Sequence, residues 1–148
     1  MGNIVFNQAL GRVASLAALP AANDALIAVP LEAAGLVSDA TMRDYDDLAT
    51  LLAGATNEQT TMGRKTLASV TVTVDDTNDR VAIDCADITW TGATGSAVGA
   101  VVICYDPDTT IGTDADLIPL TKHDLAMTPD GSNFTLTVAD FYRATSTA

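Results

Sequence analysis

The sequence is short of aromatic, cysteine and basic residues, and each shortage excludes a class of protein. Phe, Trp and Tyr make up 5% of the 148 residues, so a core has to be built from small aliphatic side chains. Cys85 and Cys104 are too few for a disulfide framework, and both fall in predicted strands, where we expect buried free thiols, with a cross-strand disulfide as the alternative. Seven basic residues against nineteen acidic ones give a net charge of −12, which repels phosphate backbones. We therefore expect no nucleic-acid partner.

Long apolar runs are missing as well. No stretch approaches the ~20 residues of a membrane-spanning helix. The N-terminus also lacks the basic and apolar regions of a signal peptide. Gly2 follows Met1 as in myristoylated proteins, but Phe6 stands where that signal requires Ser or Thr. These absences predict a soluble chain that is made in the cytoplasm and has no membrane partner.

What the sequence does contain is a strongly apolar segment at residues 97–105, bounded by Gly95-Ser96 and Asp106-Pro107. A short apolar run that is rich in β-branched residues and ends at turn residues is typical of a strand buried on both faces. We predict that it is the central strand of a single domain spanning residues 1–148. A chain of this length can bury a core without disulfide or metal crosslinks.

The first third of the chain predicts an arm, a strand and a helix. Residues 1–20 are mildly amphipathic and are expected to form an N-terminal arm that packs on the domain or on a neighbouring subunit. Residues 25–33 predict a strand, which Pro30 places at a sheet edge because proline lacks an N–H group. Residues 39–53 have the apolar spacing of one helical face after the capping residue Ser38, so one short helix is predicted there.

The rest of the chain predicts mainly strands. Valine and threonine alternate over residues 70–74, residues 75–79 predict a turn, and Val81, Ile83 and Cys85 resume the inward face, which together predict a hairpin with one buried face. A bulge at 86–87 would turn Trp90 into the core. A second hairpin is predicted over residues 125–138, and residues 143–148 are expected to fray. About seven or eight strands with a turn every eight to twelve residues predict a mainly β fold (bordering on α+β), an antiparallel β-sandwich.

The acidic loop at residues 106–116 is the only candidate binding site for a metal. Asp106, Asp108, Asp114 and Asp116 alternate there and carry oxygen ligands of the kind that Ca²⁺ takes. The loop does not match an EF-hand, because Ile111 replaces the required glycine and no glutamate closes it. A solvated turn is the preferred interpretation, so no metal site is predicted.

No catalytic residue and no cofactor are predicted. A nucleophile motif is missing, and His123, the single histidine, has no candidate partners for a triad or a zinc site. We expect His123 to lie in a surface turn. The chain is therefore not predicted to be an enzyme.

Six stretches carry a likeness to known proteins: residues 6–13, 36–53, 64–67, 74–81, 104–110 and 120–124. Together they resemble a family of small virion structural proteins of tailed bacteriophages, of the capsid decoration or cement type. The resemblance implies a non-enzymatic protein that binds the major capsid protein, stabilises the shell and forms a homo-oligomer, with a trimer favoured. It also implies synthesis in the cytoplasm of the host bacterium. The strong negative charge favours the outer capsid surface, away from packaged DNA.

The predicted interface with the shell or with sister subunits uses the arm and the strand at 25–33. Its candidate residues are Ile4, Val5, Phe6, Leu10, Val13, Leu16, Ile27, Val29 and Leu31. The alternative is a tail-associated or host-adhesion β-sandwich module that binds carbohydrate or Ca²⁺ through the loop at 106–116.

Overall fold

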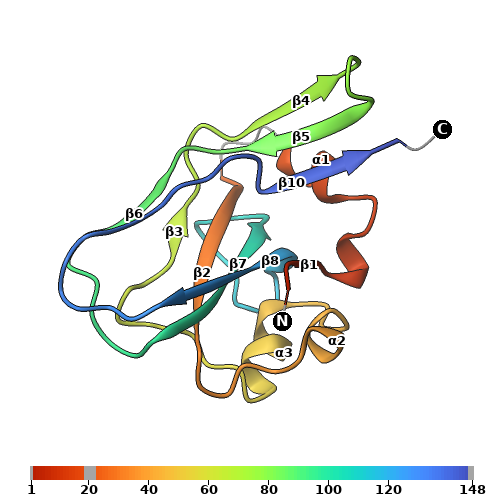
Figure 1. The fold of residues 1–148 in the computed structure, drawn as a ribbon. Coiled ribbons are helices and arrows are strands. Elements are labelled where there is room, and N and C mark those ends of the chain that lie inside the picture. The colour runs from red at the N-terminus through yellow and green to blue at the C-terminus, as the bar shows by residue number, and fades with distance from the viewer. Residues whose placement is uncertain (1, 19–22, 147–148) are drawn as a thin grey trace.

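A five-stranded antiparallel sheet with the order β1-β8-β7-β2-β3 forms the centre of the fold (Figure 1). The protein was analysed as a computed structural model, which describes residues 2–18 and 23–146. The strands are β1 (Ile4–Val5), β2 (Ala25–Glu32), β3 (Lys65–Thr66), β7 (Val98–Asp106) and β8 (Ile118–Met127). β7 lies in the middle of the sheet, and six of its nine residues are buried. The predicted central strand is confirmed.

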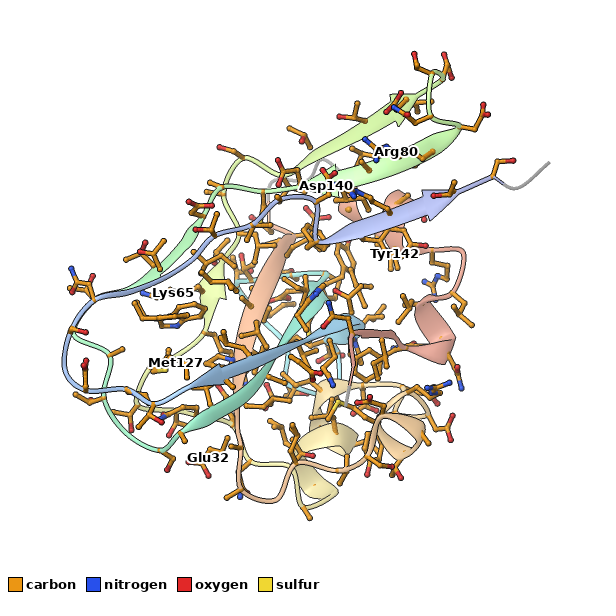
Figure 2. The ribbon with its side chains drawn as sticks, viewed as in Figure 1. Glu32, Lys65, Arg80, Met127, Asp140 and Tyr142 are labelled. Atoms are coloured by element: carbon orange, nitrogen blue, oxygen red, sulfur yellow. The ribbon has the colours of Figure 1, made fainter. Side chains whose placement is uncertain are left out.

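Two smaller sheets complete the strand layers. The first has the order β10-β5-β4, with β4 (Thr71–Asp75), β5 (Arg80–Asp84) and β10 (Tyr142–Thr145), and the second pairs β6 (Ile88–Trp90) with β9 (Phe134–Leu136). Figure 2 shows Arg80 and Tyr142 on the three-stranded sheet, at the opposite end of the molecule from Glu32 of β2. Strands make up 37% of the chain and helices 13%, so the predicted mainly β, sandwich-like fold is confirmed.

The core between these layers is mostly aliphatic, as the scarcity of rings predicts. Its largest fully buried apolar side chains include Trp90 and Phe6 together with leucines and methionine. Trp90 also donates from its indole nitrogen to the carbonyl oxygen of Gly63 at 2.9 Å, which satisfies its one polar atom. The prediction that Trp90 reaches the core is therefore confirmed.

β2 is not an edge strand, contrary to the prediction from Pro30. It lies between β7 and β3, and Val29 at its centre is fully buried. The carbonyl oxygen of Pro30 accepts from the Gln59 N–H at 2.8 Å, so the proline nitrogen also faces that side, away from β7. The long ladder with β7 loses no hydrogen bond, and only two residues of β3 pair on the other side.

The single helix predicted over 39–53 is two shorter helices, α2 (Asp39–Met42) and α3 (Leu48–Ala53). Asp47 lies between them in an extended conformation, with φ −144 and ψ 163. Its carboxylate accepts from the Thr50 N–H at 2.7 Å, so it begins a new helix as an N-cap residue. Ser38 caps α2 in the same way, as predicted.

The second predicted hairpin, over 125–138, does not form. β8 is continuous to Met127, and β9 pairs with β6 rather than with β8. After β5 the chain leaves the three-stranded sheet, and β6 pairs with β9 in a different sheet. Residues 85–87 therefore connect two sheets and do not form a bulge within one strand. Residues 143–145, expected to fray, pair with β5 as part of β10, and residues 147–148 lie outside the described part of the chain.

The N-terminal arm contains β1, a 3₁₀ turn η1 (Asn7–Ala9) and a short helix α1 (Val13–Ala17). β1 pairs with the middle of β8 (Figure 1). On either side of β1, the Gly2 N–H donates to Asp39 Oδ2 at the start of α2 and the Asn7 N–H donates to the carbonyl oxygen of Arg43 just after it. Residue 1 and residues 19–20 of the predicted arm lie outside the described residues.

Candidate functional site

Six of the nine predicted interface residues are buried in the chain's own core. They are Phe6, Val13, Leu16, Ile27, Val29 and Leu31, all less than 9% exposed. Their burial explains their apolar character without any partner, so these six side chains do not form an exposed interface in this structure. Ile4 and Val5 are half-buried in β1, and Leu10 is 62% exposed. Of the nine, Leu10 is the residue that is open to a partner.

A tight turn presents Leu10. Leu10 has φ −53 and ψ 124, Gly11 has φ 76, and the Arg12 N–H donates to the Ala9 carbonyl oxygen at 2.8 Å. These values define a type II turn with Leu10 and Gly11 at its corners, and the positive φ explains why glycine follows leucine. Because Ala9 and Val13 on either side are buried, the turn is fixed to the body and Leu10 projects from it.

A fully buried lysine ties the arm to the body. Lys122 of β8 is 0% exposed, and its Nζ lies 2.7 Å from Asp39 Oδ1 and 2.6 Å from Asp124 Oδ1. The other oxygen of Asp39 accepts from the Gly2 N–H at 2.7 Å, and Asn3 Oδ1 accepts from the Asp124 N–H at 2.9 Å. The hydrogen bond from Lys122, followed by that from Gly2, lowers the pKa of Asp39 below its ordinary value. This group links the arm, α2 and β8 at one point.

The burial of Lys122 is not among the predictions from the sequence. The available signal is its position two residues before Asp124 on a strand, which places both side chains on the same face. Gln59, which is 1% exposed, carries no such signal. Its amide donates to the carbonyl oxygens of Thr94 and Ser96 at 3.3 and 2.7 Å, and so connects two loops.

The loop at 106–116 forms the wall of a surface pocket of about 370 Å³. Asp106, Asp108 and Asp114 line this pocket together with Arg64, whereas the carboxylate of Asp116 accepts from the N–H of Thr113 at 2.8 Å. Within residues 2–18 and 23–146, no three His, Cys, Asp or Glu side chains are placed so that they could hold a metal ion. The four aspartates that alternate in the sequence do not converge.

Arg64 holds this loop to the body. Its guanidinium donates to both carboxylate oxygens of Glu58, at 2.9 and 2.6 Å, and to both of Asp114, at 2.6 and 3.0 Å. These hydrogen bonds, first those to Glu58 and then those to Asp114, raise the pKa of Arg64 further above its ordinary value. One cation between two carboxylates is a rigid and geometrically defined connection.

His123 lies in β8 rather than in a surface turn, contrary to the prediction. Its Nε2 is 2.9 Å from the hydroxyl oxygen of Thr121, and its ring meets the edge of Phe141 with 6.4 Å between ring centres. Burial, and then the charge of Lys122, lower its pKa. It lines a pocket of about 190 Å³ between β7, β8 and the segment at 136–141, whose other walls are mainly apolar.

The two cysteines are free and buried, as predicted. Burial, followed by the charges of Asp84 and Asp87, raises the pKa of Cys85 to about 11. Burial also raises the pKa of Cys104, which is 0% exposed in β7. Both thiols therefore have the character of small core residues.

No protein-family model, no curated protein and no solved structure matches this chain. Among the described residues, none of the helices has both the length and the apolar character needed to cross a lipid bilayer.

Proposed function

We propose that the protein is a non-enzymatic virion structural protein that decorates the outer surface of a tailed-phage head and stabilises the shell. The observation that carries this proposal is the resemblance to small phage virion proteins, which extends over six stretches of the sequence. The net charge of −12 supports an outer position, because a protein of this charge is repelled by packaged DNA. The partner in this proposal is the major capsid protein, and the working form is a homo-oligomer, with a trimer favoured.

Contact with the shell is proposed to run through the turn that carries Leu10. A partner that covers Leu10 removes an exposed apolar side chain from water, and the rigid turn loses little conformational freedom when it binds. One such contact per subunit is weak. An oligomer on a lattice makes several at once, so the effective affinity rises by multivalency.

The experiment mixes purified protein with phage heads that lack it. The full chain is expected to bind at a fixed number of copies per head and to raise the temperature at which the heads break open. No saturable binding to such heads would refute the proposed function.

Leu10→Glu tests the proposed contact, and Val74→Glu on β4 is the matched control. Val74 is 69% exposed and lies on the β4–β5 hairpin rather than on the turn, so both variants place a carboxylate at an exposed apolar site. Leu10→Glu is expected to lose binding while Val74→Glu keeps it. The opposite result would move the contact from the arm to the hairpin.

A further inference from the structure

The surface pocket beside the loop at 106–116 has the size of a small-molecule site and a wall rich in hydrogen-bonding groups. Its volume of about 370 Å³ lies within the range of small-molecule pockets, roughly 300–1,000 Å³. Hydroxyl and carboxylate groups dominate the wall, with Thr109, Thr110 and Thr113 contributed by the loop. Ile27 and Leu117 add apolar surface.

The polar groups of the pocket are held in place before any ligand arrives. Asp108 Oδ1 accepts from the Thr110 N–H at 3.0 Å and from its hydroxyl at 2.6 Å. The Thr109 N–H donates to the carbonyl oxygen of Asn23 at 2.6 Å, and Arg64 fixes Asp114 on the opposite side. A ligand therefore meets a preformed surface and pays little for ordering it.

The charges of the wall select against two classes of ligand. Glu58 and Asp114 neutralise Arg64, so Asp106 and Asp108 leave the pocket negative and unfavourable for phosphates and carboxylates. The carboxylates and hydroxyls of its mixed wall are unfavourable for a wholly apolar ligand, which would leave these groups without hydrogen bonds. A neutral ligand with many hydroxyl groups fits both conditions, because each hydroxyl can donate to a carboxylate oxygen and accept from a threonine.

We infer that this pocket binds a neutral saccharide, one hexose unit at a time. The carboxylates of Asp106 and Asp108 accept from sugar hydroxyls, and the threonine hydroxyls both donate and accept. Ile27 and Leu117 pack against the carbon–hydrogen face of the ring. This site is separate from the turn at Leu10 and does not depend on the proposed role on the capsid.

The test is an NMR titration of the full-length, ¹⁵N-labelled protein with glucose, galactose, mannose and N-acetylglucosamine, each as a separate probe. At least one sugar is expected to shift the amide signals of residues 108–113 with a dissociation constant in the millimolar range. Shifts confined to other regions, or no shift with any of the four sugars, would overturn the inference. CaCl₂ and putrescine are titrated in parallel, and binding of either one at these amides without any sugar binding would also overturn it.

Asp108→Asn and Asp130→Asn form a matched pair for this titration. Asp130 accepts from the Ser132 N–H at 2.9 Å and from its hydroxyl at 2.6 Å, which repeats the arrangement of Asp108 and Thr110 outside the pocket. Asp108→Asn keeps the oxygen that supports the loop and replaces the second oxygen with an NH₂ group. It is expected to weaken sugar binding at least fivefold, whereas Asp130→Asn leaves binding unchanged. Equal affinities for both variants and the wild type would contradict the assignment.

Discussion

Replacement of Lys122 by methionine tests how much the buried lysine stabilises the point where the arm, α2 and β8 meet. Removing one partner of a buried ion pair costs about 3–5 kcal/mol, because a charge is left without its counterion. Here the two carboxylates that remain are 20% and 35% exposed, so water can replace part of the lost interaction. We therefore expect Lys122→Met to lower the free energy of unfolding by about 2–3 kcal/mol. For a chain of this length the melting temperature should fall by about 4–12 °C.

The assay is urea denaturation at several pH values. Because the pKa of Asp39 is lowered in the folded state, its contribution to stability is present above its ordinary value of 3.8 and is lost as the pH falls through the lower folded pKa. The wild type should therefore lose stability as the pH falls below about 3.8, and Lys122→Met should lose less over the same interval. The hydrogen bond from Gly2 to Asp39 remains in the variant, so part of this dependence should persist.

Lys65→Met on β3 is the matched control, because it removes the same charge at a half-exposed position (Figure 2). Its stability should stay within about 0.5 kcal/mol of the wild type. The variant that combines Lys122→Met with Asp39→Asn should lose less than the sum of the two single losses, since the pair interacts directly. If Lys122→Met is as stable as the wild type, or if the losses are additive, the lysine does not stabilise the point where the arm, α2 and β8 meet.

Three further predictions concern the core, a helix cap and the cysteines. Phe6→Ala should cost about 3–5 kcal/mol in urea denaturation, because Phe6 is 0% exposed and its removal leaves a cavity; a smaller loss would mean that the arm packs loosely. Asp47→Ala should cost about 1 kcal/mol through loss of the α3 cap, whereas exposed Asp46→Ala should change stability little, and equal effects would contradict the capping role. In the folded protein Cys85 and Cys104 should resist iodoacetamide at pH 8, since burial raises both pKa values. Mass spectrometry should detect two labels only after the protein is unfolded. Labelling of the folded protein as fast as of the unfolded protein would contradict the burial of the thiols.

The sequence predicted those parts of the fold that depend on local pattern. The apolar run of β7 is a buried strand and β4 pairs with β5 as a hairpin, both as predicted, but the predicted buried face of that hairpin does not extend to Val74, which is 69% exposed. Which strand pairs with which is not determined by local sequence pattern. β9 has the pattern of a hairpin partner for β8, but it pairs with β6, which is more than forty residues away. Hairpin prediction fails there because two strands with the correct period compete for the same segment.

For a related reason, the sequence does not separate the buried interface candidates from the exposed one. An apolar residue in an arm has the same sequence pattern whether it packs against its own body or against a neighbour. Phe6 and Val13 are buried by long-range contacts, so only the structure distinguishes them from Leu10, which is exposed. The pocket at 106–116 was predicted only as an acidic loop, because the Arg64–Asp114 contact that shapes it joins residues fifty positions apart.

The pairing of both chain ends with interior strands has a consequence for biosynthesis. β1 cannot find its place until residue 122 has emerged from the ribosome, and β5 waits for residues 142–145 before its second side is covered. At ~5–20 residues per second, these early segments spend several seconds without their final neighbours. A ribosome that stalls before the last strand therefore leaves an open β5 edge, which other nascent chains can join. Loss of the final residues should thus reduce the yield of soluble protein before it affects any property of the finished molecule.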